Sequence, residues 1–134
     1  WFLKEEIKGD VRALFITREN IDASGSFATG LTVNKVPNFV QKTKTRPSQY
    51  AISMIAKLRT TGAVLRESVV SGNFPDMNVL RIKVTKNDGN VVVHYIAIGD
   101  DSKNIFYLIS FESSERDWDE QIKIGTPMLN FFAL

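Results

Sequence analysis

The chain has 134 residues, of which 43% are hydrophobic and 24% are charged, and its formal net charge is +2. This length and composition are typical of one globular domain whose core needs no metal or disulfide, so we expect residues 1–134 to form a single domain. The charge is too small to predict binding to nucleic acid or to an anionic membrane. The absence of cysteine excludes thiol nucleophiles, disulfides and cysteine-ligated metal centres.

The amino-terminal part of the chain favours β-strands. Residues 1–7 and 11–18 flank Gly9-Asp10, a pair that forms turns, so we expect a hairpin of two strands. A third strand is predicted over residues 27–36, and it should end before Pro37. Because the chain begins at Trp1 rather than at a methionine, we expect that a first strand and any targeting segment precede it.

A helix is predicted to begin at Pro47. Proline suits a first helical turn because its missing N–H is not needed there. Apolar residues recur at helical spacing from Tyr50 to Leu58, so one face of the helix should be buried. Gly62 is expected to cap the carboxyl end.

Three or four strands should follow in quick succession, at residues 63–73, 78–86, 91–98 and 105–112. Asp88-Gly89 predicts a two-residue type I′ turn between the middle two strands. That turn would place Lys83 opposite His94. The turns are short, which predicts a mostly antiparallel sheet. The final strand is apolar on both sides and should therefore be covered on both faces.

Acidic residues crowd around Trp118 after the last strand. Ser114 and Asp117 have the spacing of a capping box, so we expect a helix whose acidic residues lie at its positive amino end. A structural role is expected for these carboxylates rather than a metal or acid–base site. Pro127 should either kink this helix or end it. The apolar stripe that should face the sheet comprises Trp118, Ile122, Gly125, Leu129 and Phe132.

The single histidine, His94, would have to serve any nucleophile–histidine–carboxylate triad. Its expected neighbours Arg81 and Lys83 disfavour the imidazolium form. We interpret His94 as a half-exposed cross-strand residue, with a general base or a metal ligand as the alternatives. The pair Asp100-Asp101 lacks the spacing of a calcium loop and is expected to form a solvated turn. The sequence therefore predicts no catalytic, cofactor-binding or metal-binding residue.

One basic segment stands out around the connector that precedes the first helix. It comprises Lys35, Lys42, Lys44 and Arg46. A solvated loop is the plain interpretation, and an electrostatic docking patch for an acidic protein is the sharper one. Nucleic acid is not expected as a partner, because no aromatic stacking platform lies nearby in the sequence.

The segment HYIAIGDDSKNIFYLISFESSERDWDEQIKIGTPMLNFF resembles the carboxyl-terminal half of PsbP-like proteins. In that family a strand leads through a turn into a strand of the FYLISF type. An acidic helix start with a tryptophan follows, and the closing segment ends near a phenylalanine. Trp1 is similar to the tryptophan that follows the first strand of the family, and the helix of residues 47–60 has the expected place in the order. The resemblance spans nearly the whole chain.

The resemblance implies an α+β fold, an α/β/α sandwich in which a central, mostly antiparallel sheet of about six strands is flanked by helices. It also implies an extracytoplasmic location: periplasm, cell surface or thylakoid lumen. The best-known members are non-enzymatic subunits or assembly factors of photosystem II. Other bacterial members are secreted or lipid-anchored, and a nuclear-transport factor that binds the small GTPase Ran shares the fold. The amino-terminal extension that plant members use for photosystem binding is not present here.

We therefore expect a non-enzymatic, extracytoplasmic PsbP-like accessory or binding protein, associated with photosystem II if its source is photosynthetic. A protein partner, a monomeric state and no cofactor are expected. Peripheral or lipid-anchored membrane association would depend on sequence upstream of Trp1. The alternatives are an interaction adaptor of the same fold, for example one that binds a small GTPase, and an unrecognised hydrolase that uses His94.

Overall fold

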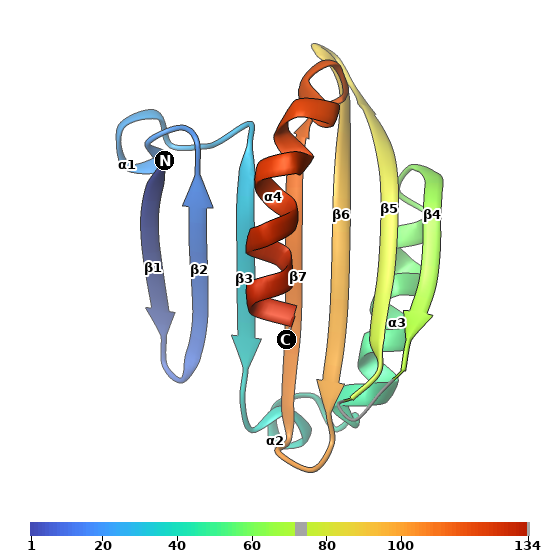
Figure 1. The fold of residues 1–134 in the computed structure, drawn as a ribbon. Helices are drawn as coiled ribbons and strands as arrows, with labels where there is room; N and C mark the ends of the chain where they lie inside the picture. Colours follow the sequence, from blue (N-terminus) through green and yellow to red (C-terminus); the bar gives the residue numbers. More distant parts are fainter. Residues whose placement is uncertain (72–74, 134) are drawn as a thin grey trace.

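The computed structural model describes residues 1–71 and 75–133. They form one sheet of seven strands in the order β1-β2-β3-β7-β6-β5-β4, and every neighbouring pair is antiparallel (Figure 1). The strands are β1 (Phe2–Lys8), β2 (Val11–Thr17), β3 (Gly30–Val36), β4 (Ala63–Val70), β5 (Met77–Lys86), β6 (Gly89–Asp100) and β7 (Ile105–Ser114). The α+β class is confirmed. The expected number of about six strands is too low, because all four of the later candidates form strands.

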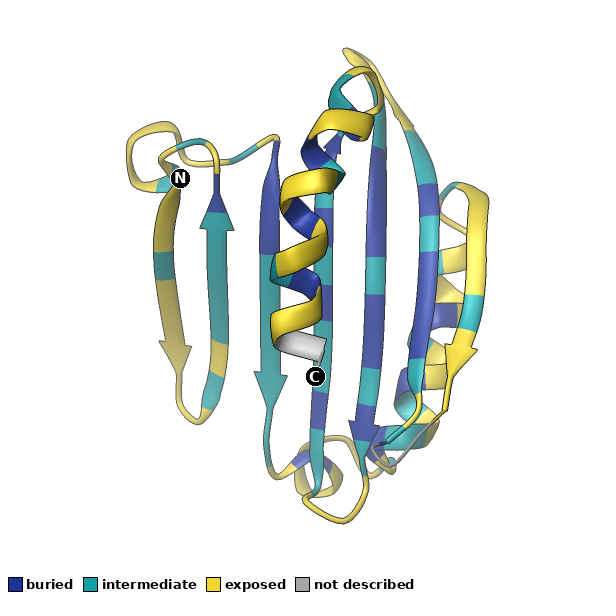
Figure 2. Ribbon diagram, viewed as in Figure 1, coloured by how far each residue is buried: buried dark blue, intermediate teal, exposed yellow. Residues whose placement is uncertain are grey.

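The helices are α1 (Ile21–Ser24), α2 (Phe39–Thr43), α3 (Pro47–Arg59) and α4 (Trp118–Ala133), and a 3-10 turn, η1 (Glu115–Asp117), precedes α4. α3 packs mainly on β5 and β6, whereas α4 packs on β7 and β3. Figure 1 shows α4 in front of the sheet and α3 behind it. Neither of these helices lies over the β1–β2 hairpin, and β1 is largely exposed (Figure 2).

Each face of the sheet has its own hydrophobic core. Val92 belongs to the core under α4, and its neighbour Val93 belongs to the core under α3. Successive strand residues point to opposite faces, so β6 supplies both cores. β7 does the same: Phe106 lies in the α3 core, and Ile109 and Phe111 lie in the α4 core. The prediction that this strand is covered on both faces is confirmed.

The β5–β6 hairpin differs from the predicted register. Lys86 pairs with Gly89, so the loop residues are Asn87 and Asp88, and Arg81 lies opposite His94. The predicted pairing of Lys83 with His94 is therefore wrong by two residues. A type I′ turn needs positive φ at both central residues, but in this hairpin the positive φ is that of Gly89, +128°. A slip of two residues leaves every side chain on its predicted face.

The helix α3 begins at Pro47 as predicted, but its carboxyl end differs. The C-cap is Thr60, in a right-handed conformation, and not Gly62. Gly62 instead lies against β5, where a Cβ atom would stand 2.5 Å from the carbonyl oxygen of Lys83. Close packing therefore explains this glycine.

The helix α4 continues through Pro127, so the alternative that the helix ends there is wrong. Its start is capped as predicted, because the Ser114 hydroxyl accepts a hydrogen bond from the Asp117 N–H over 3.3 Å. Trp118 is buried against the sheet. Gly125 lies flat on the ring of Phe111, with no room for a side chain between them. The side chain of Phe132 and the end of the predicted strand 63–73 fall outside the described parts of the chain.

Candidate functional site

The four basic residues of the predicted docking patch lie on separate elements. Lys35 is in β3, between Arg12 and Tyr107 of the neighbouring strands. Lys42, in α2, forms an ion pair with Asp10 over 2.7 Å. Lys44 and Arg46 are exposed at the two ends of the short link between α2 and α3. Asp10 therefore compensates Lys42, and the charge of Arg46 adds to the effect of the Ser48 hydrogen bonds in lowering the pKa of Asp101.

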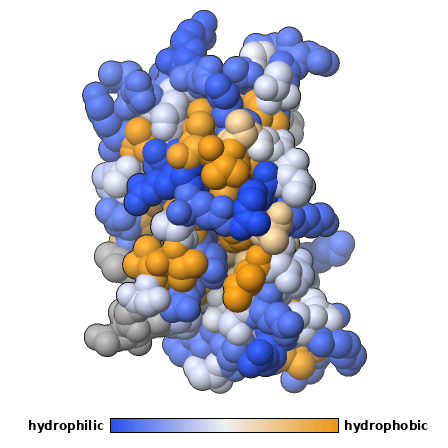
Figure 3. All heavy atoms as spheres, turned by 90° about the vertical axis from the view of Figure 1, so that its right-hand side faces the viewer, coloured by the Kyte–Doolittle hydropathy of each residue, from blue (hydrophilic) through white to orange (hydrophobic). Residues whose placement is uncertain are grey.

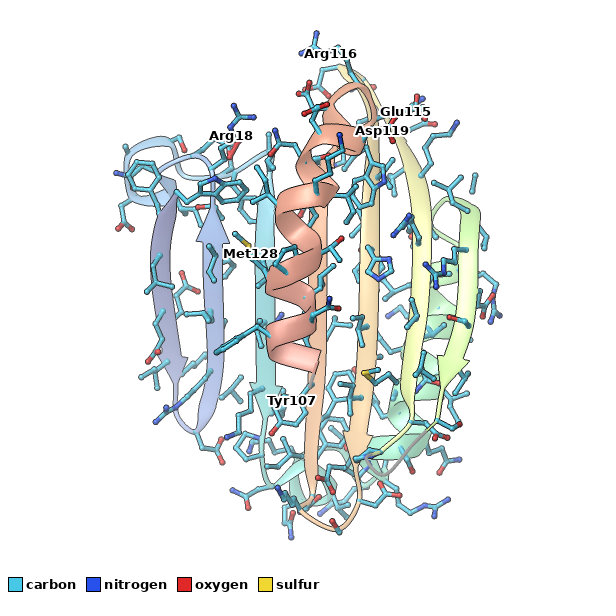
Figure 4. All side chains as sticks on the ribbon, viewed as in Figure 1. Arg18, Tyr107, Glu115, Arg116, Asp119 and Met128 are labelled. Carbon is cyan, nitrogen blue, oxygen red and sulfur yellow. The ribbon has the colours of Figure 1, made fainter. Side chains whose placement is uncertain are left out.

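The acidic residues around α4 serve the local structure. Glu115 forms an ion pair with Lys83 over 3.2 Å and accepts a hydrogen bond from Asn90. Figure 4 shows Glu115, Arg116 and Asp119 together at the end of the sheet where α4 begins. Among the described residues, no three histidine, aspartate or glutamate side chains are placed to hold a metal ion.

The Asp100-Asp101 turn also has a structural role. Asp101 accepts hydrogen bonds from the backbone N–H of Ser48 over 2.9 Å and from its hydroxyl. This carboxylate therefore caps the amino end of α3 from a distant part of the chain. Asp100 accepts hydrogen bonds within its own turn, from Ser102 and from the N–H of Lys103.

His94 is buried rather than half-exposed, so that prediction is wrong. Only 7% of the residue is accessible, because it faces the same side of the sheet as Val92 and Ile96 of the α4 core. Its Nδ1 accepts a hydrogen bond from the Nε of Arg81 over 3.2 Å. Burial, and then the positive charges of Arg81 and Arg66, lower the pKa of His94 from 6.5 to about 4. The imidazole is therefore neutral at pH 7.

Arg81 connects this histidine to α4. Its guanidinium carbon lies 5.1 Å from the ring centroid of Trp118, which is a cation–π distance. In the next strand, Arg66 pairs directly with Arg81, and both side chains are on the α4 side of the sheet. Burial, and then the charge of Arg66, lower the pKa of Arg81. We call Arg66 and Arg81 the arginine pair.

The arginine pair has no carboxylate partner. Across residues 1–71 and 75–133, the ion pairs within 4.0 Å involve other cations. Two buried polar atoms on the same side of the sheet also lack a hydrogen-bond partner: the hydroxyl of Ser68 and the amide oxygen of Gln121. Ser68 is two residues after Arg66, and Gln121 is one turn after Trp118. Guanidinium groups are well suited to bind carboxylate or phosphate, so the arginine pair can hold an anion, whereas the Gln121 oxygen is an acceptor and does not contribute to anion binding.

Sequence reasoning did not find the arginine pair, because finding it requires the register of two hairpins. The predicted register placed Lys83 opposite His94 and Arg81 only beside it, whereas Arg81 lies directly opposite. In the other hairpin, a bulge between Val64 and Arg66 shifts the pairing of β4 with β5 by one residue. The sequence Asn87-Asp88-Gly89 was the available signal for the correct β5–β6 register, because the glycine follows the two loop residues. The bulge in β4 had no signal in the sequence.

Glu112 and His94 lie on opposite sides of the sheet. Glu112 pairs with Val93, whose side chain is in the α3 core, so Glu112 faces that side. With Glu19, it lines an open depression of about 670 Å³, and His94 is not among the lining residues. Burial raises the pKa of Glu112, and Glu19 adds to this effect although Lys86 opposes it. The sheet therefore separates these carboxylates from the histidine.

Both edges of the sheet expose apolar side chains. In β4, the residues Val64, Leu65, Val69 and Val70 are between 45% and 59% exposed. Figure 3 views the molecule from the β4 side and shows apolar side chains among polar ones on this surface. At the other edge, Leu3 and Ile7 of β1 are 71% and 59% exposed.

No family model and no curated protein matches the chain. One similar solved structure is a protein from Bacteroides thetaiotaomicron VPI-5482, with 14% sequence identity and a TM-score of 0.46. The match covers 84% of this chain and 35% of that protein, so the chain spans about a third of its length. Among the described residues, no helix combines the length and the apolar character that crossing a bilayer requires.

Proposed function

We propose that this chain is a non-enzymatic binding domain with a PsbP-like α/β/α sandwich, which works outside the cytoplasm and binds another protein. The sequence resemblance supports the family and the location. If the source is photosynthetic, the partner would belong to photosystem II. The alternative is an interaction adaptor of the same fold in another compartment. The experiment below distinguishes this adaptor from the extracytoplasmic protein.

The state of His94 is the single observation that carries the non-enzymatic part of the proposal. A general base needs an accessible nitrogen and a pKa near the working pH. His94 is buried, its Nδ1 already accepts from Arg81, and its pKa is about 4. The partly buried Glu112 lies on the other side of the sheet. These positions oppose the hydrolase alternative.

The exposed apolar residues of β4 support the binding part of the proposal. Proteins usually protect an edge strand with charge, proline or a covering element, because its free backbone groups pair readily with other chains. Of the four apolar residues named above, each is at least 45% exposed. Such a surface fits a protein partner. The basic residues Lys44 and Arg46, at the amino end of α3, are a second candidate docking surface.

The proposal is tested in the source organism with the tagged full-length gene product. Cross-linking and affinity capture should recover a partner from the membrane or extracytoplasmic fraction. Recovery of cytosolic partners alone would contradict the proposed location and favour the adaptor. In a parallel screen against ester, amide and phosphoester substrates, a hydrolysis activity that the His94→Gln variant loses would overturn the non-enzymatic assignment.

A further inference from the structure

We propose that an extended acidic segment of a protein partner adds to the sheet as a strand beside β4, with one of its carboxylates over the arginine pair. This inference rests on the proposed function, because it names the surface and the chemistry of the partner. It combines two observations: an edge strand with an accessible backbone, and two adjacent cations without an anion.

The strand β4 can accept a neighbour. In the described parts of the chain it pairs only with β5, so its other side has no strand partner. From Arg66 to Val70 the pairing with β5 is regular, and this stretch contains no proline or glycine. An added strand gains main-chain hydrogen bonds along such an edge, and its alternate side chains supply the specificity.

Charge indicates which residue the added strand should carry. On the α3 side of β4, Glu67 already accepts a hydrogen bond from the Nε of Arg59 over 3.0 Å. On the α4 side, Arg66 stands opposite Arg81, and neither takes part in the ion pairs found among the described residues. Like charges directly opposite each other destabilise a sheet, and opposite charges stabilise it. A carboxylate opposite Arg66 would therefore relieve a repulsion and accept hydrogen bonds from a guanidinium.

A second copy of this chain would not supply the missing carboxylate. Two β4 strands related by a two-fold axis would pair antiparallel with their faces preserved. On the α4 side the second strand would then present Arg66, Ser68 and Val70, none of which is acidic, because Glu67 faces the α3 side. A partner segment with an acidic residue on the α4 side supplies the charge that a second copy lacks.

Across the residues that the structure describes, the other edge has no cation opposite another cation. In β1, Lys4 pairs with Phe15 and Lys8 pairs with Val11 of the neighbouring strand. Lys4 also forms ion pairs with Asp22 over 2.8 Å and with Glu6 over 3.6 Å. The repulsion that a carboxylate would relieve is therefore a feature of the β4 edge.

The experiment uses the isotope-labelled chain and a short capped peptide that alternates threonine and valine around a central glutamate. Matched peptides carry glutamine or lysine at the centre. In amide NMR titrations, the glutamate peptide should shift resonances of residues 64–70 and of Arg81. It should bind about fivefold more tightly than the glutamine peptide, and the lysine peptide should bind most weakly. No shift in β4, or equal binding of the three peptides, would overturn the proposal.

Charge reversal provides the matched variants. Arg66→Glu should reverse the order, so that the lysine peptide binds best. Arg18→Glu makes the same change of charge at a residue near the opposite edge of the sheet, next to β2 (Figure 4). This variant should leave the order of the peptides unchanged. In the capture experiment, a partner that binds Arg66→Glu as well as the native chain would contradict this inference and leave the proposed function intact. Failure to capture any partner would count against the proposed function instead.

Discussion

The Nε of Arg81 donates a hydrogen bond to the Nδ1 of His94 over 3.2 Å. The contact joins the strands β5 and β6 under the amino-terminal turn of α4, where Trp118 covers the same guanidinium. The histidine is thus held as an uncharged acceptor beside a permanent cation. Protonation would remove the hydrogen bond and add a repulsion, so the fold should respond to acid through this residue.

We expect the free energy of unfolding to rise with pH between about 4 and 6.5. His94 has a folded pKa of about 4 and an ordinary pKa of 6.5, so the unfolded chain binds more protons in this window. The contribution is complete above pH 6.5 and is lost as the pH falls towards 4. Each pH unit corresponds to about 1.4 kcal/mol, which gives at most about 3 kcal/mol. Urea unfolding at a series of pH values measures it.

The variant His94→Gln isolates this contribution, because the glutamine oxygen can still accept from Arg81 but cannot titrate. The variant should show a flatter pH dependence over the same window. Glu112 titrates in the opposite direction, since its raised pKa favours folding at lower pH, and it remains in both proteins. Identical slopes for the two proteins would rule out His94 as the source.

Reversing one charge of the arginine pair should stabilise the isolated chain. In Arg66→Glu, a carboxylate would stand opposite Arg81 in place of a like charge. Cross-strand pairs of opposite charge contribute about 0.2–1 kcal/mol, and the gain should shrink at high salt. Arg18→Glu should give no comparable increase in thermal-unfolding temperature. A loss of stability in Arg66→Glu would show that the two guanidinium groups do not repel each other in the folded chain.

The sequence predicts local structure well where one signal is sufficient. Gly9 marks the first hairpin, Pro47 marks the start of α3, and Ser114 marks the start of α4, and all three appear in the structure. These signals act within a few residues of the backbone. The apolar pattern of β7 also predicts correctly that this strand contributes to hydrophobic cores on both of its faces.

The arginine pair could not be predicted because it depends on alignments between strands. A two-residue offset in the β5–β6 loop and a bulge in β4 decide which side chains lie opposite each other. The two-residue offset leaves each side chain on its face, whereas the one-residue bulge puts Arg66 on the other face from Val64. The expectation that His94 is half-exposed failed for a different reason. Its burial depends on α4, which is distant in the sequence and covers this side of the sheet.

The capping of α3 by Asp101 should contribute to stability. Asp101→Ala removes the acceptor of the Ser48 N–H, and loss of such a cap costs about 1 kcal/mol. Asp101→Asn keeps an acceptor and should recover most of this. The hydrogen bonds to Ser48 lower the pKa of Asp101, so the contribution is present above its ordinary pKa and declines as the pH falls below it. Urea unfolding at pH 7 compares the three proteins, and equal midpoints would exclude a capping role.

The contact between Gly125 and Phe111 should make α4 intolerant of a larger residue at this position. Alanine would normally favour a helix by about 1 kcal/mol over glycine. Here its Cβ would stand 2.8 Å from three carbon atoms of the Phe111 ring, and Phe111 is fully buried. Overpacking of a core costs about 1–3 kcal/mol, so Gly125→Ala should lower the free energy of unfolding despite its better propensity. Asn130→Ala, at an exposed site of the same helix, is the matched control and should be neutral or slightly stabilising. If chemical unfolding shows Gly125→Ala to be as stable as this control, α4 does not pack on β7 at the distance described.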